Sequence, residues 1–296
     1  MQVRELRVPF LEYSTYVRIV GESTEHAPII LLHGGPGSTH NYMELLDSVA
    51  DTGRQVISYD QLGCGNSYLD GHPQLWTMET WISELETIIE YLKLERFYIM
   101  GQSWGGMLLL EYLLRHGNEG KVKGAVLSST LPASWLWAKE QHRMIRFMTQ
   151  EEQAIIRKAE ETGDFSNPEY LDVNEHFMQL HCAGPYVPGV DPECLTRPKK
   201  SGHESYLYGW GPNEYNPTGS LKDFDVIDRL GEIKVPCLVM SGTDDLCTPL
   251  IAKTMADRIP NAKWHLFAGA RHMCYADSNE EYIQVLSNWM QELEME

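Results

Sequence analysis

Short, continuously apolar runs alternate along the chain with longer stretches in which apolar residues recur at helical spacing. Apolar runs that end in glycine or polar residues are typical of buried strands. After a first strand in residues 1–13, such runs occupy 27–35, 54–67, 120–130, 233–245 and 262–272. Amphipathic stretches predict helices over 78–94 (capped by Thr77 or Thr80), near 249–258 and over 279–293, and residues 96–117 predict a strand, a turn and a helix. This alternation predicts an α/β protein with a mainly parallel, doubly wound sheet.

Residues 132–222 interrupt the alternation. The stretch is rich in Trp, Tyr, His and Pro, contains helical segments and lacks strand-type runs. We therefore expect a core made of residues 1–131 and 223–296, with 132–222 inserted as a helical cap. Such an insertion would cover the carboxyl ends of the strands, where catalytic groups lie in these folds. We expect His176 and His181, which belong to the insertion, to pack or to face solvent.

Length and composition are those of a globular protein, with 296 residues of which 43% are hydrophobic. No apolar stretch approaches the roughly 20 residues that span a bilayer, and the first residues lack the pattern of a signal peptide. The six cysteines form no CxxC pair and no zinc-like spacing with histidine. We therefore expect no membrane association, reduced thiols and a cytoplasmic location.

The formal net charge of −18 argues against a nucleic-acid partner, whose phosphates would be repelled. Two interpretations of the charge stay open. It is either a solvated acidic surface that keeps the protein in solution, or a field that favours cationic substrates such as free amino termini. Net charge alone does not separate them.

The hexapeptide "GQSWGG" at 101–106 lies between an apolar run and a helical stretch. A Gly-x-Ser-x-Gly pattern is weak evidence alone, so its context carries the argument. A nucleophilic serine on a sharp turn needs a strand before it, a helix after it and small neighbours. Gly101, Gly105 and Gly106 supply the small residues, and the new helix places backbone N–H groups beside Ser103. We predict that Ser103 is a nucleophile.

A serine hydroxyl needs a base, and the base needs a carboxylate to orient it. Downstream of Ser103, one predicted strand ends in Asp244 and Asp245, and the last ends in His272. Of eleven histidines, His272 alone lies between the final predicted strand and the final predicted helix, which makes it the predicted base. The order of serine, acid and histidine suits this chemistry. Asp244 and Asp245 are both candidates for the carboxylate that orients the base. We favour Asp245 and expect Asp244 to be a capping or turn residue.

The pentapeptide "HGGPG" at 33–37 follows an apolar strand and suits an oxyanion hole. Backbone donors aimed at developing negative charge typically contribute about 2.7–4 kcal/mol each. Gly35 has no side chain to keep its N–H from a ligand, and Trp104, the residue after the nucleophile, would supply the second N–H. The alternative is a turn that needs glycine only for its backbone geometry. We expect His33 to be structural.

With these motifs the sequence resembles the proline iminopeptidases, a family with the α/β-hydrolase fold. Four stretches carry the resemblance: "HGGPG", "YDQLGCGNS", "GQSWGGML" and "GPNEYNPTGSLKDFD" (211–225). The resemblance implies an α/β-hydrolase fold with a helical cap inserted before the catalytic acid. It also implies a serine aminopeptidase that releases proline, or another small or apolar residue, from the amino end of short peptides.

The resemblance further implies that acidic residues near the cap hold the free amino group of the substrate. Glu214, in "GPNEY", matches one such position; otherwise it is a loop carboxylate that faces solvent. A carboxylate at a fixed distance from Ser103 would bind the ammonium. The bond that follows the first residue would then lie at the serine. In many relatives a glutamate follows the catalytic aspartate, but here that position is Leu246. Amino-acid amides, esters or broader dipeptides and tripeptides therefore stay open as substrates.

The expected reaction is acyl transfer through an acyl-enzyme, without metal or cofactor. Its expected partner is a short peptide or aminoacyl amide with a free amino terminus. Large aromatic residues of the cap are candidates to line a pocket for a proline ring: Trp135, Trp137, Tyr206, Tyr208 and Trp210. Two rivals are an esterase or amidase that uses the same triad, and a non-catalytic binding protein on a hydrolase scaffold. Loss of a triad member is the usual sign of the second, and none is missing here.

Overall fold

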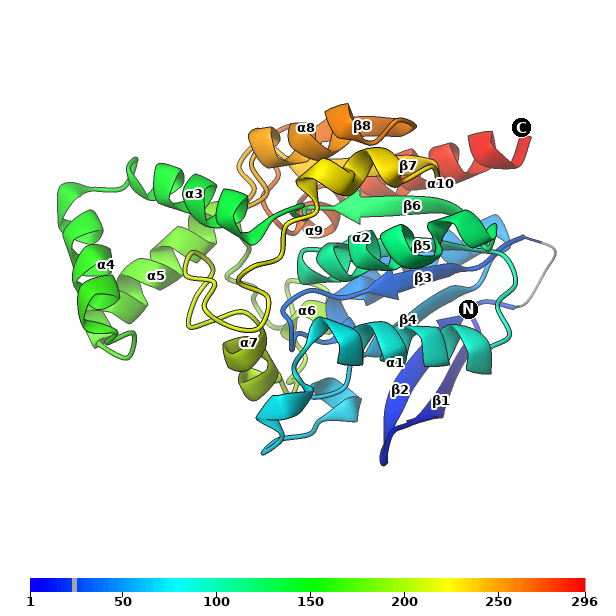
Figure 1. Cartoon of the computed structure of the whole chain (residues 1–296), viewed down its shortest axis with the longest axis horizontal. Coiled ribbons are helices and arrows are strands. Elements are labelled where there is room, and N and C mark those ends of the chain that lie inside the picture. Colours follow the sequence, from blue (N-terminus) through cyan, green and yellow to red (C-terminus); the bar gives the residue numbers. More distant parts are fainter. Residues whose placement is uncertain (23–25, 296) are drawn as a thin grey trace.

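The computed structural model describes residues 1–22 and 26–295, and its centre is an eight-stranded sheet (Figure 1). The strand order is β1-β2-β4-β3-β5-β6-β7-β8. The pairs β1–β2 and β2–β4 are antiparallel, and the other neighbours are parallel, which confirms the predicted mainly parallel sheet. The strands are β1 (Val3–Phe10), β2 (Tyr13–Val20), β3 (Ile29–Leu32), β4 (Val56–Asp60), β5 (Phe97–Gln102), β6 (Val122–Ser128), β7 (Cys237–Gly242) and β8 (Ala262–Phe267).

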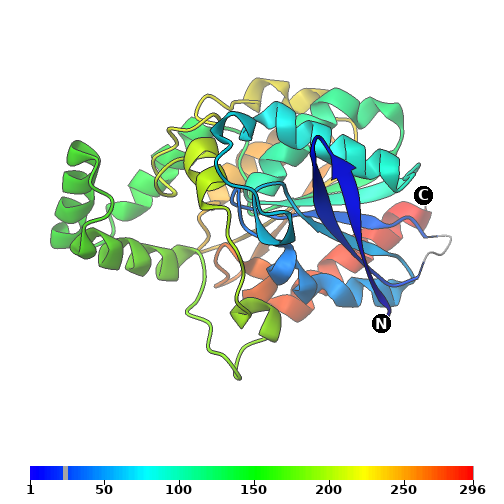
Figure 2. The same ribbon diagram turned by 90° about the horizontal axis from the view of Figure 1, so that it is seen from below.

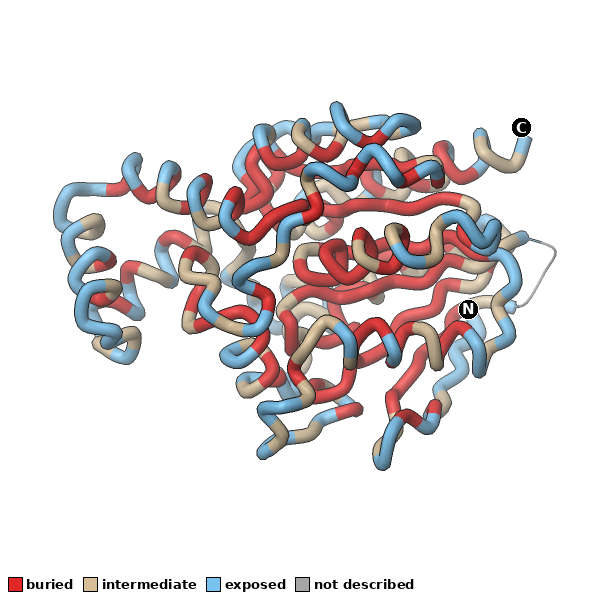
Figure 3. The backbone as a smooth tube through the Cα atoms, viewed as in Figure 1, coloured by how far each residue is buried: buried red, intermediate tan, exposed pale blue. Residues whose placement is uncertain are grey.

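Helices cover both faces of this sheet, which is why its central strands are largely apolar on both faces. In β3, for example, Ile30 and Leu32 belong to one core cluster, and Ile29 and Leu31 belong to the other. The first face is covered by α1 (Met78–Tyr91), α2 (Trp104–His116) and α8 (Pro249–Arg258). The second is covered by the 3-10 segment η1 (His40–Thr52), α9 (Cys274–Asp277) and α10 (Asn279–Met295). The central strands are accordingly buried along most of their length (Figure 3).

The strand β2 (Tyr13–Val20) was not predicted, because its sequence mixes polar and apolar residues. Its polar side chains are buried with partners that are distant in sequence. Thr15 donates a hydrogen bond to Glu84, and both outer nitrogens of Arg18 bond Asp47 at 2.7 and 2.8 Å. A polar residue whose hydrogen bonds are satisfied can be buried at little cost, so local apolar pattern does not reveal such a strand.

The stretch between β6 and β7 contains helices and loops, which extend beyond one end of the sheet (Figures 1 and 2). The helices are α3 (Ser134–Ile145), α4 (Gln150–Thr162), α5 (Pro168–His181), α6 (Glu193–Thr196) and α7 (His203–Gly209). The end from which they extend is the carboxyl end of the parallel strands. The helical character predicted for this stretch is therefore present.

The remaining predicted helices agree closely with the structure. The helix α8 coincides with its prediction, and α1 begins at Met78, where the Thr77 side chain accepts a hydrogen bond from the Thr80 N–H at 3.4 Å. All six cysteines have free thiols. Among the described residues, no helix combines the length and apolarity needed to cross a membrane.

Glu84 is a fully buried carboxyl group on α1. It accepts hydrogen bonds from the Thr15 hydroxyl and the Leu62 N–H. Burial raises its pKa to about 8, against the lowering effect of those two bonds. Between the ordinary pKa of a glutamate and pH 8, the unfolded chain therefore loses this proton while the folded protein keeps it. Stability must fall as pH rises through that interval, by up to about 1.4 kcal/mol per pH unit.

We expect Glu84→Gln to flatten this pH dependence, because glutamine accepts from Leu62 and carries no charge at any pH. Urea unfolding at pH 5 to 9 should show the variant gaining stability relative to the wild type as pH rises. Glu90→Gln, at an exposed position of the same helix, is the matched control. Parallel profiles for the wild type and Glu84→Gln would show that Glu84 does not titrate in this range.

Candidate active site

Ser103 occupies the sharp turn between β5 and α2. Its backbone has φ 55° and ψ −124°, a strained conformation for a residue with a side chain. The turn is held by backbone bonds from the Ser103 N–H to Ser128 O (3.0 Å) and from the Gly106 N–H to Ser103 O (2.9 Å). Thr130 donates its hydroxyl to Ser103 O at 2.6 Å. The side chain is thereby presented above the carboxyl end of the sheet.

The glycines around Ser103 are required by close backbone contacts. A Cβ atom at Gly101 would collide with the carbonyl of Gly105, and one at Gly105 would collide with the carbonyl of Leu32. At Gly106 it would collide with the side chain of Thr130. The small residues singled out in the sequence are thus those that allow the turn to pack between neighbouring strands.

His272 and Asp245 lie together, although they are 27 residues apart in the chain. Asp245 follows β7, His272 follows β8, and His272 Nδ1 lies 2.8 Å from Asp245 Oδ1. Only 1% of Asp245 and 5% of His272 is exposed, so this pair is shielded from water. Asp245 also accepts from the N–H groups of Gly242 (3.1 Å) and Cys247 (2.7 Å), which orients its carboxylate.

The neighbouring aspartate has a different environment. Asp244 is exposed, and its backbone N–H donates to Ala270 O at 3.0 Å. Its carbonyl lies 2.9 Å from Nδ1 of His181, a residue that we had expected only to pack or to face solvent. His176, by contrast, is exposed and pairs with Glu152. Of the two candidate acids, the structure thus brings Asp245 to His272.

Gly35 and Trp104 lie beside Ser103, and all three line one small cavity. Gly35 has φ 116°, a conformation open to glycine, and a Cβ there would approach the Gly37 nitrogen to 2.6 Å. Next to it, His33 is fully buried, and its Nε2 accepts from the Gln61 N–H at 3.0 Å. Burial lowers the pKa of His33 to about 4, so it is neutral and acts as a hydrogen-bonding partner within the loop.

A pocket of about 390 Å³ opens over Ser103. Ser103, His272 and Glu214 all line it, so three of the residues singled out in the sequence meet at one cavity. The remaining walls come from loops after strands and from the helical stretch between β6 and β7; they include Gly35, Tyr42, Met178, Cys182, Tyr206 and Met273. The volume is in the range of sites for small molecules.

Glu214 lies on a loop after α7, and its Oε1 accepts a hydrogen bond from the Tyr206 hydroxyl at 2.7 Å. Its backbone carbonyl accepts from the indole N–H of Trp137 at 2.9 Å. Burial raises the pKa of the Glu214 carboxyl, while the Tyr206 bond and the nearby His272 oppose that shift. Glu214 is therefore a partly desolvated carboxylate that faces the pocket, not a loop residue in open water.

The aromatic candidates divide into two groups. Trp137 and Trp210 line the small inner cavity beside Ser103, and Tyr206 lines the larger pocket. Trp135 and Tyr208 are 51% and 50% exposed and line neither of these two cavities. Helical spacing explains the split, because adjacent residues of a helix face different directions.

Sequence reasoning missed Met107 and Leu131, which complete the apolar wall of the inner cavity. Met107 is one turn after Ser103 on α2, and Leu131 follows β6. Both lie directly after segments that the sequence pattern had identified. Leu246, the residue after Asp245, is fully buried, and its carbonyl accepts from Gln141 at 2.7 Å.

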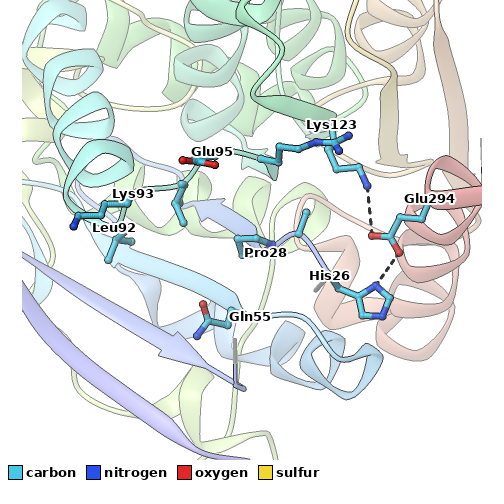
Figure 4. Close-up of a pocket in the computed structure, with 11 residues that line it drawn as sticks. His26, Pro28, Gln55, Leu92, Lys93, Glu95, Lys123 and Glu294 are labelled. Carbon is cyan, nitrogen blue, oxygen red and sulfur yellow. Dashed lines mark hydrogen bonds and ion pairs between the residues drawn. The ribbon is translucent and has the colours of Figure 1, made fainter. Parts of the chain in front are cut away.

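A larger cavity, of about 630 Å³, lies at the opposite end of the sheet (Figure 4). Its lining includes Pro28 and Gln55, which precede β3 and β4, whereas Ser103 follows β5. Glu294 lies in this cavity between His26 (3.2 Å) and Lys123 (3.9 Å). The larger hollow is thus remote from the serine. Within residues 1–22 and 26–295, no three His, Cys, Asp or Glu side chains are grouped so that they could hold a metal ion.

Comparison with known proteins identifies the family and the fold. The alpha/beta hydrolase fold family matches residues 27–278. A proline iminopeptidase of Clostridioides difficile (strain 630) is 53% identical over 291 residues, which span 98% of this chain and 99% of that protein. One of Lactobacillus helveticus (strain DPC 4571) is 50% identical over 98% of each chain. The crystal structure of proline iminopeptidase from Mycobacterium smegmatis is 30% identical, covers 99% of both chains and superposes with a TM-score of 0.86. The predicted fold is confirmed, and the chain belongs to the proline iminopeptidase family of α/β hydrolases.

Proposed function

We propose that this protein is a serine aminopeptidase that releases an N-terminal proline, or another small or apolar residue, from short peptides through an acyl-enzyme. One observation carries the proposal: Ser103, His272 and Glu214 line the same pocket, and His272 is bonded to the buried Asp245. A nucleophile, a base and a carboxylate for an amine are what removal of an N-terminal residue requires. The relatives named above are proline iminopeptidases, which supports this choice of reaction.

In the proposed mechanism, His272 takes the proton of Ser103 as the serine oxygen attacks the carbonyl carbon of the first residue. The bond from Nδ1 to Asp245 leaves Nε2 for the serine and balances the charge of the imidazolium. The N–H groups of Gly35 and Trp104 hold the oxyanion. His272 then gives its proton to the leaving amine. Water, deprotonated by the same imidazole, hydrolyses the ester and restores the serine.

We propose that Glu214 limits cleavage to one residue at the amino end of the substrate. A free ammonium carries a positive charge, and Glu214 is a desolvated carboxylate on the same pocket as the nucleophile. Binding of the ammonium favours the ionised carboxylate, which offsets the cost of its burial. The nitrogen of an N-terminal proline ring is itself the ammonium, and the methylene groups of that ring suit contact with the apolar side chains of Trp137, Trp210 and Leu131 beside Ser103. The substrate is then held with its amine at Glu214 and its scissile carbonyl at Ser103.

We further propose that residues 132–222 act as a cap over a core of residues 1–131 and 223–296. The cap contributes Met178, Tyr206 and Glu214 to the pocket, which favours short, extended peptides over folded chains. The net charge of −18 argues against a nucleic-acid partner. Free thiols on all six cysteines support a role in the cytoplasm.

A panel of aminoacyl p-nitroanilides tests this function. We expect cleavage of the proline, alanine and leucine compounds with free amino groups, with proline preferred, and none of their N-acetylated forms. An acyl ester belongs in the same panel, because turnover of the ester without cleavage of any anilide would identify an esterase and reject the aminopeptidase.

Glu214→Gln removes the negative charge but keeps an acceptor for Tyr206. We expect kcat/KM for prolyl p-nitroanilide to fall about 10–100-fold, mostly through KM, because a hydrogen bond to a charged group is lost. Turnover of an ester that lacks an amino group should change little. Glu161→Gln, an exposed substitution on α4, is the control. Equal losses on both substrates would mean that Glu214 supports the site without binding the amine.

A further inference from the structure

The loop that carries His272, residues 270–273, is attached to the helical cap as well as to the sheet. The His272 N–H donates to His181 O at 3.0 Å, and the Met273 N–H donates to Cys182 O at 3.2 Å. Both acceptors belong to the carboxyl end of α5. The backbone of His272, the proposed base, is thus hydrogen-bonded to the end of the cap helix α5.

Arg271 adds a side-chain connection at the same place. Its Nη1 donates to Gln179 O in the last turn of α5 at 2.9 Å and to Gly184 O in the loop that follows the helix at 3.1 Å. Its Nε and Nη2 bond the Asp277 carboxylate at 3.1 and 2.9 Å, and Asp277 also accepts from the Arg271 N–H at 2.8 Å. One guanidinium therefore joins the cap to α9 of the core.

The chemistry of a helix end explains why an arginine suits this position. The last carbonyls of a helix have no partner within it, and a positive charge there is favoured by the helix dipole. The planar guanidinium can reach both carbonyls and the Asp277 carboxylate together, whereas a lysine ammonium acts as a single point. Only 25% of the Arg271 side chain is exposed, so solvent screens these contacts weakly.

The same end of α5 also contacts the substrate pocket, through Met178 and Cys182. A shift of α5 would change the pocket wall and the acceptors of the His272 loop together. His181 strengthens the link, because its Nδ1 lies 2.9 Å from the carbonyl of Asp244, beside the acid. We propose that Arg271 is a positioning residue that couples the placement of α5 to the orientation of His272. The inference rests on the proposed role of His272 as the base.

Arg271→Met tests the inference, because methionine fills similar space and makes none of the bonds of the guanidinium group. We expect kcat for prolyl p-nitroanilide to fall about 10–100-fold, since a displacement of about 1 Å in a catalytic group has such an effect. KM should change less than kcat, because Arg271 does not line the pocket and reaches it only through the α5 end that carries Met178 and Cys182. Arg271→Lys should recover part of the loss. Arg229→Met, at an exposed arginine that pairs with Glu232, is the control.

Two readouts separate positioning from loss of structure. Rates are expressed per active site, counted by titration with a fluorophosphonate, so that unfolded protein does not count. The loss should be larger for the anilide than for a p-nitrophenyl ester, because the anilide leaving group needs a proton from His272 and the ester leaving group does not. A lowered Tm with unchanged kcat per site would overturn the inference and leave Arg271 a structural residue.

Failure of the inference and failure of the proposed function are distinguishable. If the wild type cleaves no aminoacyl anilide, the proposed function is rejected, and the rate of fluorophosphonate labelling still reports how well His272 activates Ser103. Labelling of Arg271→Met at the wild-type rate would then overturn the coupling. If Arg271→Met does not fold, Arg271→Lys takes its place, with an expected labelling rate about 3–10-fold below the wild type and the same criterion for rejection.

Discussion

Replacement of Ser103 by alanine is expected to abolish peptide hydrolysis, with kcat lowered by about 10⁴-fold or more. No other hydroxyl takes the place of the nucleophile on the turn between β5 and α2, where Ser103 is held by backbone bonds to Ser128 and Gly106. The N–H groups beside it remain, so substrate binding should persist. KM for prolyl p-nitroanilide should therefore change far less than kcat.

The same variant should be as stable as the wild type. Ser103 has a positive φ of 55°, and alanine meets the same strain there that serine already carries. Circular dichroism and Tm should match the wild type, and fluorophosphonate labelling should vanish. Ser166→Ala, at an exposed loop position, is the control and should retain full activity. Residual labelling of Ser103→Ala at the wild-type rate would place the nucleophile elsewhere.

Asp245→Asn is expected to lower kcat by about 10⁴-fold with little change in fold. An asparagine amide keeps the shape of the carboxylate but cannot balance an imidazolium. Its NH2 group replaces one of the two oxygens, which accept from Gly242 at Oδ2 and from Cys247 and His272 at Oδ1. With the NH2 group toward Nδ1, His272 is no longer held with Nε2 free to accept the serine proton. The pH profile of kcat/KM measured beside the wild type should show the loss across neutral pH.

Asp244→Asn is the matched control for this substitution. Asp244 is exposed and contacts the site through its backbone, so we expect activity within about threefold of the wild type, as for most surface substitutions. A larger loss in Asp244→Asn than in Asp245→Asn would reverse the roles that the structure favours.

The course of the main chain was largely predictable from sequence. Alternating apolar runs and amphipathic stretches identified seven of the eight strands, because strands buried between two layers of helices are largely apolar on both faces. The exception was β2, whose polar residues Thr15 and Arg18 are buried with Glu84 and Asp47. Those partners lie 69 and 29 residues away, beyond the reach of any local pattern.

The site was predictable to a lesser degree. The order of Ser103, Asp245 and His272, each after a strand, follows from the rule that catalytic groups lie at the carboxyl ends of parallel strands. Which aromatic residues face the pocket did not follow. Trp135 and Trp137 are two residues apart on one helix, yet only Trp137 packs beside the His272 ring, with centroids 5.6 Å apart. The roles of these residues in catalysis stay predictions until the variants above are measured.

The sequence by itself determined most of the segments that become strands and helices, β2 excepted. It also determined where glycine lets a strand turn sharply into a helix around Ser103, because such properties depend on neighbours a few residues away. Only the tertiary structure decided that Asp245 rather than Asp244 meets His272, and that Arg271 joins α5 to α9. These choices depend in part on backbone groups, such as the Gly242 and Cys247 N–H groups that orient Asp245 and the carbonyl of Gln179 that accepts from Arg271. Residue type does not predict which of these groups pair, because the pairing depends on how segments that are distant in sequence pack together.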